Sequence, residues 1–143
     1  MSPFRDNLFA GKSAFIAGGT SGINLGIAIR LAELGAKVTV CGRDGDKARR
    51  AAATIGVGAL GLSADVRDYE IVRSAMVQAH DTHGPLDIVI SGAAGNFLAP
   101  ALAMSANAFA TVVDIDLNGT FNVFRGSHDL LNTPGASLIA ITA

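Results

Sequence analysis

Residues 13–26, SAFIAGGTSGINLG, decide the fold of this 143-residue chain. The stretch begins with a short apolar run that ends in a glycine cluster, and such a run predicts a buried strand. Apolar residues then recur at helical spacing from Ile23 to Leu34, and Gly35 provides a helix stop. Glycines between a strand and a helix permit positive φ angles and let backbone N–H groups approach a pyrophosphate at the helix N-terminus. The stretch therefore predicts a dinucleotide-binding loop, with an ordinary βα turn as the alternative.

The rest of the chain repeats this alternation of strand and helix. Asp44 and Asp68 are placed as helix N-caps. The pattern predicts strands at 13–17, 37–41, 58–63, 87–90 and 137–141, and helices at 23–34, 44–53, 68–83 and 105–131, the last bent near Gly119. The connections between strands are long enough for parallel pairing, and such crossovers are right-handed. The pattern therefore predicts an α/β fold, a doubly wound parallel sheet of the Rossmann type with strand order 3-2-1-4-5. A ligand crevice is expected between strands one and four, where the order reverses.

Composition narrows the class of protein. Hydrophobic residues make up 50% and charged residues 16% of the chain, which suits a sheet buried on both faces. A net charge of −1 offers no basic surface for nucleic acid, and no apolar run has membrane-spanning length. The single cysteine, Cys41, excludes an intrachain disulfide, and the N-terminal segment does not resemble a signal peptide. We therefore expect a cytoplasmic protein; the three histidines lack ligand spacing, so no metal site is expected.

Several motifs along the chain resemble those of the short-chain dehydrogenase/reductase family. The glycine loop is similar to the family's TGxxxGxG pattern, although Ala17 stands for the threonine and Asn24 for the third glycine. Asp65-Val66 resembles the pair that contacts adenine, residues 91–95 stand where the family has NNAG, and residues 116–119 resemble its N-x-x-G segment. The resemblance implies a cofactor-binding set of Gly18, Thr20, Ser21, Gly22, Ile23, Asn24, Arg43, Asp65, Val66, Ala93, Ala94 and Gly95.

The end of the second predicted strand bears on the choice of cofactor. Enzymes of this architecture that use NAD place an acid there to accept from the ribose 2′-OH. This chain has Gly42 followed by Arg43, a small residue and a guanidinium that would admit and pair with a 2′-phosphate. The alternative is a solvated arginine beside Asp44 and Asp46. The sequence favours NADP(H).

Three further segments are similar to the 2,4-dienoyl-CoA reductase branch of that family. They are AAGNF at 93–97, DID at 114–116 and GTFN at 119–122. The resemblance implies hydride transfer from NADPH to a conjugated enoyl- or dienoyl-CoA thioester, followed by protonation of the dienolate. It places Asp116 in proton delivery, with Asn96 and Phe97 lining the acyl region. Asp116 could instead be a structural helix acid, and Asn96 and Phe97 could only shape their loop.

The chain is expected to be a single domain, 1–143, truncated before the family's Tyr-x-x-x-Lys segment. Its only tyrosine, Tyr69, opens an upstream helix, and Ala143 stands where the wider family has a serine. We expect a fragment that binds dinucleotide at most, from a protein that is a homo-oligomer when complete, with an open edge on its fifth strand. A short-chain ketone or alcohol oxidoreductase and a non-catalytic dinucleotide-binding module remain alternatives.

Overall fold

The computed structural model describes residues 4–142; Ala143 and the first residues of the N-terminal segment discussed above lie outside this range. Its centre is a parallel sheet in the order β3-β2-β1-β4-β5, which confirms the predicted Rossmann topology. The strands are β1 (Ser13–Ala17), β2 (Lys37–Gly42), β3 (Leu60–Ser63), β4 (Ile88–Ser91) and β5 (Ser137–Ala140).

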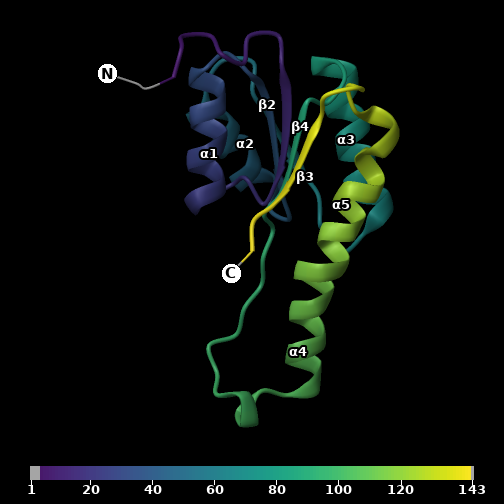
Figure 1. Cartoon of the computed structure of the whole chain (residues 1–143). Coiled ribbons are helices and arrows are strands. Elements are labelled where there is room, and N and C mark those ends of the chain that lie inside the picture. Colours follow the sequence, from purple (N-terminus) through teal and green to yellow (C-terminus); the bar gives the residue numbers. More distant parts are fainter. Residues whose placement is uncertain (1–3, 143) are drawn as a thin grey trace.

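Helices cover both faces of the sheet (Figure 1). Helices α1 (Gly22–Glu33) and α2 (Gly45–Ile55) lie on one face, and α3 (Tyr69–His83) and α5 (Gly119–Ser127) lie on the other. Successive strand residues point to opposite faces. In β1, Ile16 therefore packs with Val38 and Val40 under α1 and α2, whereas Phe15 packs with Met76 and Val123 under α3 and α5. Both cores hold the carboxyl ends of the central strands in place.

Local chemistry explains where two of the helices begin. The Asp44 carboxylate accepts from the Lys47 backbone N–H at 3.0 Å, and Asp68 accepts from the Ile71 N–H at 3.1 Å, as their predicted N-cap roles require. β3 begins at Leu60, later than expected from the pattern, because positive-φ Gly58 still belongs to the preceding turn.

The predicted helix 105–131 is interrupted in the structure. It consists of α4 (Ala106–Val113), a π-helical segment η2 (Asp114–Asn118), α5 and a 3₁₀ turn η3 (His128–Leu130), so the irregularity precedes Gly119 instead of centring on it. α4 projects beyond the carboxyl edge of the sheet, connected to β4 by a long loop that contains the 3₁₀ turn η1 (Ala101–Ala103) (Figure 1). π-Helical insertions of this kind are frequent at functional sites.

β5 forms one edge of the sheet. It pairs with β4, and within residues 4–142 no strand pairs with its other side. Its residues are exposed, including 45% of Leu138 and 42% of Ile139. In the described part of the chain, no helix is long and apolar enough to cross a membrane.

Candidate functional site

The main cleft lies at the carboxyl edge of the sheet, where the strand order reverses. It measures about 640 Å³. Nine members of the predicted cofactor set line it: Gly18, Thr20, Ser21, Asn24, Arg43, Asp65, Val66, Ala93 and Ala94. The other lining residues are Gly42, Asp44, Lys47, Ala64, Gly92 and Ile115. The predicted residues Gly22, Ile23 and Gly95 are not among them. The crevice is thus where the strand order predicts it.

Gly18 occupies a position that only glycine fits. Its φ is +77°, and an added Cβ would lie 2.6 Å from the Ala93 backbone nitrogen. Its N–H donates to the Cys41 carbonyl at 2.9 Å, which joins the loop to the end of β2. Gly22 also has a positive φ, of 59°, and begins α1 with open space around its Cα. The loop therefore presents backbone N–H groups at a helix N-terminus, the arrangement that binds a pyrophosphate.

Asn24, in the first turn of α1, reaches across the cleft floor. Its side-chain Nδ2 donates to the Gly92 carbonyl at 2.7 Å and approaches the Gly18 carbonyl at 3.4 Å. Its Oδ1 is buried and makes no hydrogen bond within residues 4–142. A side chain at position 92 would have to displace the Asn24 amide, because a Cβ added to Gly92 would lie 2.4 Å from Asn24 Nδ2. The residue in place of the family's third glycine therefore bridges the glycine loop and the loop after β4.

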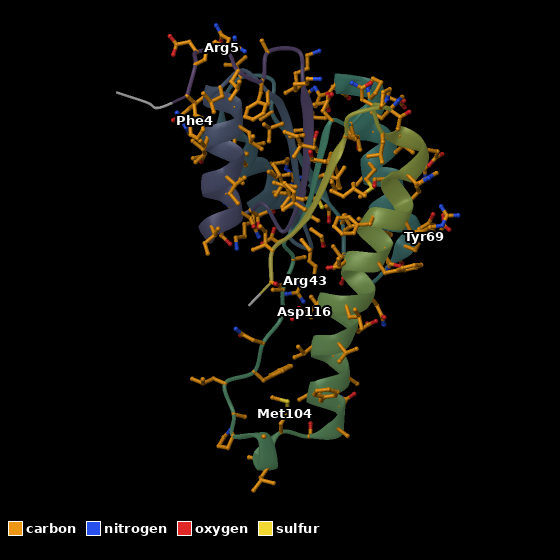
Figure 2. All side chains as sticks on the ribbon, viewed as in Figure 1. Phe4, Arg5, Arg43, Tyr69, Met104 and Asp116 are labelled. Carbon is orange, nitrogen blue, oxygen red and sulfur yellow. The ribbon has the colours of Figure 1, made fainter. Side chains whose placement is uncertain are left out.

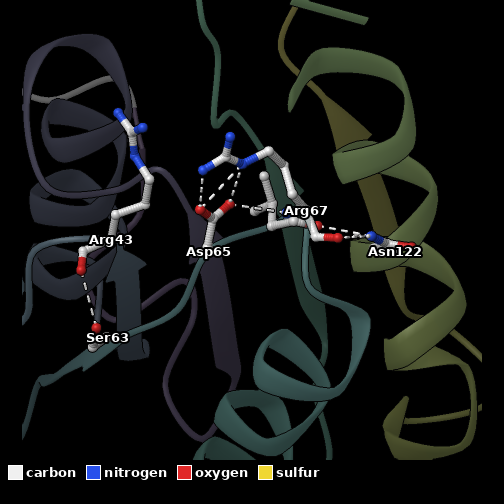
Figure 3. Close-up of polar contacts among 6 residues, drawn as sticks. Arg43, Ser63, Asp65, Arg67 and Asn122 are labelled. Atoms are coloured by element: carbon white, nitrogen blue, oxygen red, sulfur yellow. Dashed lines mark hydrogen bonds and ion pairs between the residues drawn. The ribbon is translucent and has the colours of Figure 1, made fainter. Parts of the chain in front are cut away.

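The wall of the cleft beside β2 is cationic. Arg43 and Lys47 both line it, and Lys47 Nζ donates to Ser21 Oγ at 3.0 Å. The Arg43 backbone carbonyl accepts from Ser63 Oγ, whereas its guanidinium makes no ion pair in the described range (Figure 3). The neighbouring Asp44 carboxylate is engaged in its helix cap, and the hydrogen bond from the Lys47 backbone holds the pKa of Asp44 below its usual value. Two cations at this wall are thus available to an anion.

Lys47 is a lining residue that sequence reasoning missed. The available signal was its position in the first turn of the helix after β2, where a side chain can point back toward the end of that strand. Asp46, which sequence reasoning considered as a neighbour of Arg43, instead forms an ion pair with Arg49.

Asp65 lies between Arg43 and Arg67, and its hydrogen bonds are to Arg67 (Figure 3). Arg67 Nη2 lies 2.6 Å from Asp65 Oδ2, and Nε also donates to the carboxylate. These side-chain hydrogen bonds lower the pKa of the Asp65 carboxyl. Asn122 on α5 donates from Nδ2 to the Val66 carbonyl at 2.8 Å, which fixes this segment against the second helical layer. Adenine contact by Asp65 and Val66 stays a prediction.

Asp116 lies in the π-helical segment. Its Oδ1 accepts from the Gly95 backbone N–H at 2.9 Å, so the carboxylate faces the loop after β4. Figure 2 shows Asp116 where α4 and α5 meet, whereas Met104 lies at the far end of that loop and Tyr69 on the side of α3. The carboxylate is exposed, and its neighbour Ile115 lines the cleft. The catalytic role of Asp116 is untested by this geometry.

The loop that carries Asn96 and Phe97 lies outside the main cleft. Both residues are exposed, Phe97 to 49%. Their role in lining the acyl region stays a prediction. Among residues 4–142, no group of histidine, cysteine and acidic side chains could hold a metal ion.

Comparisons with known proteins agree with the fold and the loop. The family model described as short chain dehydrogenase matches residues 12–143. A peroxisomal 2,4-dienoyl-CoA reductase [(3E)-enoyl-CoA-producing] from Arabidopsis thaliana is 38% identical over 99% of this chain and 52% of its own length. The rat enzyme of the same name is 42% identical over 98% of this chain and 50% of its own. The chain thus spans about half the length of these curated relatives.

A solved structure is similar over the same range. The citronellol catabolism dehydrogenase of Pseudomonas aeruginosa PAO1 has a TM-score of 0.89 at 29% identity, covering 99% of this chain and 60% of that one.

The expected cytoplasmic location is contradicted by these comparisons. The plant and rat relatives, and one from Saccharomyces cerevisiae, are named peroxisomal. The expectation was wrong because net charge and a single cysteine do not distinguish one reducing compartment from another.

Proposed function

The chain belongs to the short-chain dehydrogenase family, and we propose that this protein is an oxidoreductase that reduces a 2,4-dienoyl-CoA with NADPH. We propose the peroxisome as its location. The cationic wall of Arg43 and Lys47 beside Gly42 is the observation that supports NADPH. The choice of substrate is supported by the names of the curated relatives and by the AAGNF, DID and GTFN segments.

The residues of the cleft fit this cofactor. The Gly18–Gly22 loop would receive the pyrophosphate at the N-terminus of α1, and Arg43 with Lys47 would pair with the 2′-phosphate. Gly42 leaves that place free of an acid, and an added Cβ there would lie 2.9 Å from Thr20 Cγ2. When bound, the cofactor supplies the hydride.

Asp116 is the group of this chain that we assign to proton delivery. Oδ1 accepts from the Gly95 N–H, so the carboxyl is oriented toward the loop after β4, and its second oxygen is the atom that we assign to proton transfer. Asp116→Asn should lower kcat by about 10²-fold, the lower end for a general acid, and leave the NADPH dissociation constant unchanged. Asp114→Asn is the matched control, because Asp114 lies in the same π-helical segment but accepts from Asn118. Equal kcat in both variants would reduce Asp116 to a structural residue.

The test of the whole proposal is a comparison of substrates and cofactors in the intact protein. Reduction of a 2,4-dienoyl-CoA with NADPH should exceed reduction of small ketones and reduction with NADH. Arg43→Ala should lower the preference for NADPH over NADH by roughly 10- to 150-fold, equal to the loss of a charged hydrogen bond of about 1.5–3 kcal/mol.

Arg49→Ala, a change on α2 to an arginine that pairs with Asp46, should leave that preference unchanged. Turnover of ketones alone, or an Arg43→Ala protein with the wild-type preference, would contradict the proposal.

We also propose that a further strand covers the open edge of β5 and that the protein works as a homo-oligomer. Exposed Leu138 and Ile139 support the first part, since an unpaired edge strand with apolar side chains is prone to association. Slow deuterium exchange of the β5 backbone amides that do not donate to β4 would support a covered edge in the intact protein, and rapid exchange of those amides would exclude it.

A further inference from the structure

The loop after β4 is held at its start and again a few residues later by side chains from two different helices. At its start, the Gly92 carbonyl accepts from Asn24 Nδ2 on α1 at 2.7 Å. At Gly95, the backbone N–H donates to Asp116 in the π-helical segment at 2.9 Å. Residues 92–95 therefore form a short bridge between the glycine loop and the segment that carries Asp116.

The contact at Gly92 depends on the side-chain sizes at positions 24 and 92. Asn24 stands where the family's loop pattern has its third glycine, and it fills the space that a side chain at 92 would need. A Cβ on Gly92 would lie 2.4 Å from Asn24 Nδ2 and 2.6 Å from its Cγ. Contacts this short would displace the Asn24 amide from its hydrogen bonds to the two loops.

The same contact fixes the orientation of the amide. Nδ2 faces two carbonyls, those of Gly92 and Gly18, so the opposite orientation would bring Oδ1 against two acceptors. In the adopted orientation Oδ1 is buried without a hydrogen-bond partner in the described residues, and an unpaired buried acceptor is unfavourable. A side chain kept at that cost, at the floor of the cleft, points to a role in placing the loops.

We propose that Asn24 is a positioning residue for the dinucleotide, with Gly92 as its steric complement. Its amide sets the gap between the phosphate-binding loop and residues 92–95, and with Asp116 it aligns both ends of the cleft. The proposal deepens the proposed function and needs from it only that the protein binds a reduced dinucleotide, for which NADPH is the probe.

The first experiment compares two asparagines in the intact protein. Asn24→Ala removes a hydrogen bond of 2.7 Å, and Asn132→Ala removes one of 2.8 Å to Asp87 at the opposite end of the sheet. Both variants should lower the thermal midpoint of the cofactor-free protein. Asn24→Ala should raise the NADPH dissociation constant by about tenfold, equal to about 1.4 kcal/mol, and Asn132→Ala should leave it unchanged within about twofold.

The second experiment tests whether the side-chain sizes at positions 24 and 92 are matched to each other. Gly92→Ala should weaken NADPH binding by about tenfold because it displaces the Asn24 amide, and it should cause no further loss in an Asn24→Gly background, where that side chain is absent. Asn24→Asp removes the donor and adds a negative charge to the cleft, so it should bind NADPH at least as weakly as Asn24→Ala even if Gly92→Ala does not fold.

The possible outcomes separate the two proposals. Wild-type protein that binds no NADPH would overturn the proposed function and this inference with it. Wild-type protein that binds NADPH would overturn the inference alone if Asn24→Asp binds equally well, or if Gly92→Ala weakens binding as much in the Asn24→Gly background as in the wild-type protein.

Discussion

The proposed preference for NADPH should be reversible by placing an acid at the end of β2. Gly42 is the last residue of that strand and lines the cleft. An added Cβ would lie 2.9 Å from Thr20 Cγ2 and 3.3 Å from Thr20 Oγ1, so Gly42→Asp alone must displace Thr20. The double variant Gly42→Asp/Thr20→Ser removes the methyl group in the way. Its carboxylate would accept from a ribose 2′-OH and repel a 2′-phosphate.

The size of the change follows from two effects of opposite sign on the two cofactors. A charged hydrogen bond to the 2′-OH should stabilise bound NADH by about 1.5–3 kcal/mol. Two like charges 4 Å apart repel by about 4 kcal/mol at the effective dielectric of a protein surface, and Arg43 and salt reduce this to about 1.5–3 kcal/mol. The sum, about 3–6 kcal/mol, should shift the ratio of the two dissociation constants by roughly 10²- to 10⁴-fold.

The assay is direct titration of the intact protein with NADPH and NADH, followed by the fluorescence of the reduced nicotinamide. The 143 residues contain no tryptophan, which keeps their own emission low. Thr20→Ser alone is the control and should keep the wild-type preference. A folded double variant whose preference stays within about threefold of wild type would refute the assignment of this wall to the 2′-phosphate, since about 0.6 kcal/mol lies far below the expected shift.

Three further predictions concern the scaffold of the site. Burial of the Asp87 carboxyl raises its pKa, but hydrogen bonds from Asn132 and other donors outweigh this effect, so the pKa in the folded protein is lower than usual. Ionised Asp87 therefore stabilises the folded state above the unfolded pKa of about 4, and this stabilisation is lost as pH falls below that value. Asp87→Asn should lower the free energy of unfolding in urea by about 2–4 kcal/mol at pH 7, and the difference should narrow toward pH 3; a gap independent of pH would contradict this. Gly18→Ala should lower the thermal midpoint and weaken NADPH binding by more than about tenfold, because the new Cβ would clash with backbone atoms at a residue that already has a positive φ. Gly135→Ala is the control: Gly135 has a φ of +119°, but an added Cβ would meet nothing within 4 Å, so this variant should lower stability by about 1–2 kcal/mol without affecting binding. Burial raises the pKa of the Cys41 thiol to about 12, so it should resist alkylation at pH 8 until the protein unfolds; labelling of the native protein at the unfolded rate would disprove this.

Those parts of the fold that depend on local pattern could be predicted from the sequence. Apolar runs separated by helical periodicity, with Asp44 and Asp68 as caps, are local signals, and right-handed crossovers turn them into one strand order. The π-helical segment could not be predicted this way. Residues 114–118, DIDLN, carry no local signal for an extra residue in the turn, and the glycine at 119 suggested the bend instead.

The candidate site was predictable where it follows the chain and hidden where it depends on contacts between distant segments. The glycine loop and Arg43 adjoin strand ends, so their place in the cleft follows from topology. Lys47 was missed because its direction depends on how α2 packs. The relation between Asn24 and Gly92 was missed because it joins residues 68 positions apart, and each looked like a separate departure from a family pattern.

The charge of the cleft shows why net charge does not reveal a proposed anion site. The chain has a net charge of −1, and the wall beside β2 holds acids as well as bases. Its acids are already engaged, Asp44 by the backbone of its own helix and Asp65 by the Arg67 guanidinium. Arg43 and Lys47 are left facing the cleft without a carboxylate partner in the described part of the chain. The field at a site is therefore set by which charges the fold has already paired, and here that pairing supports the proposal of a cofactor with one more phosphate.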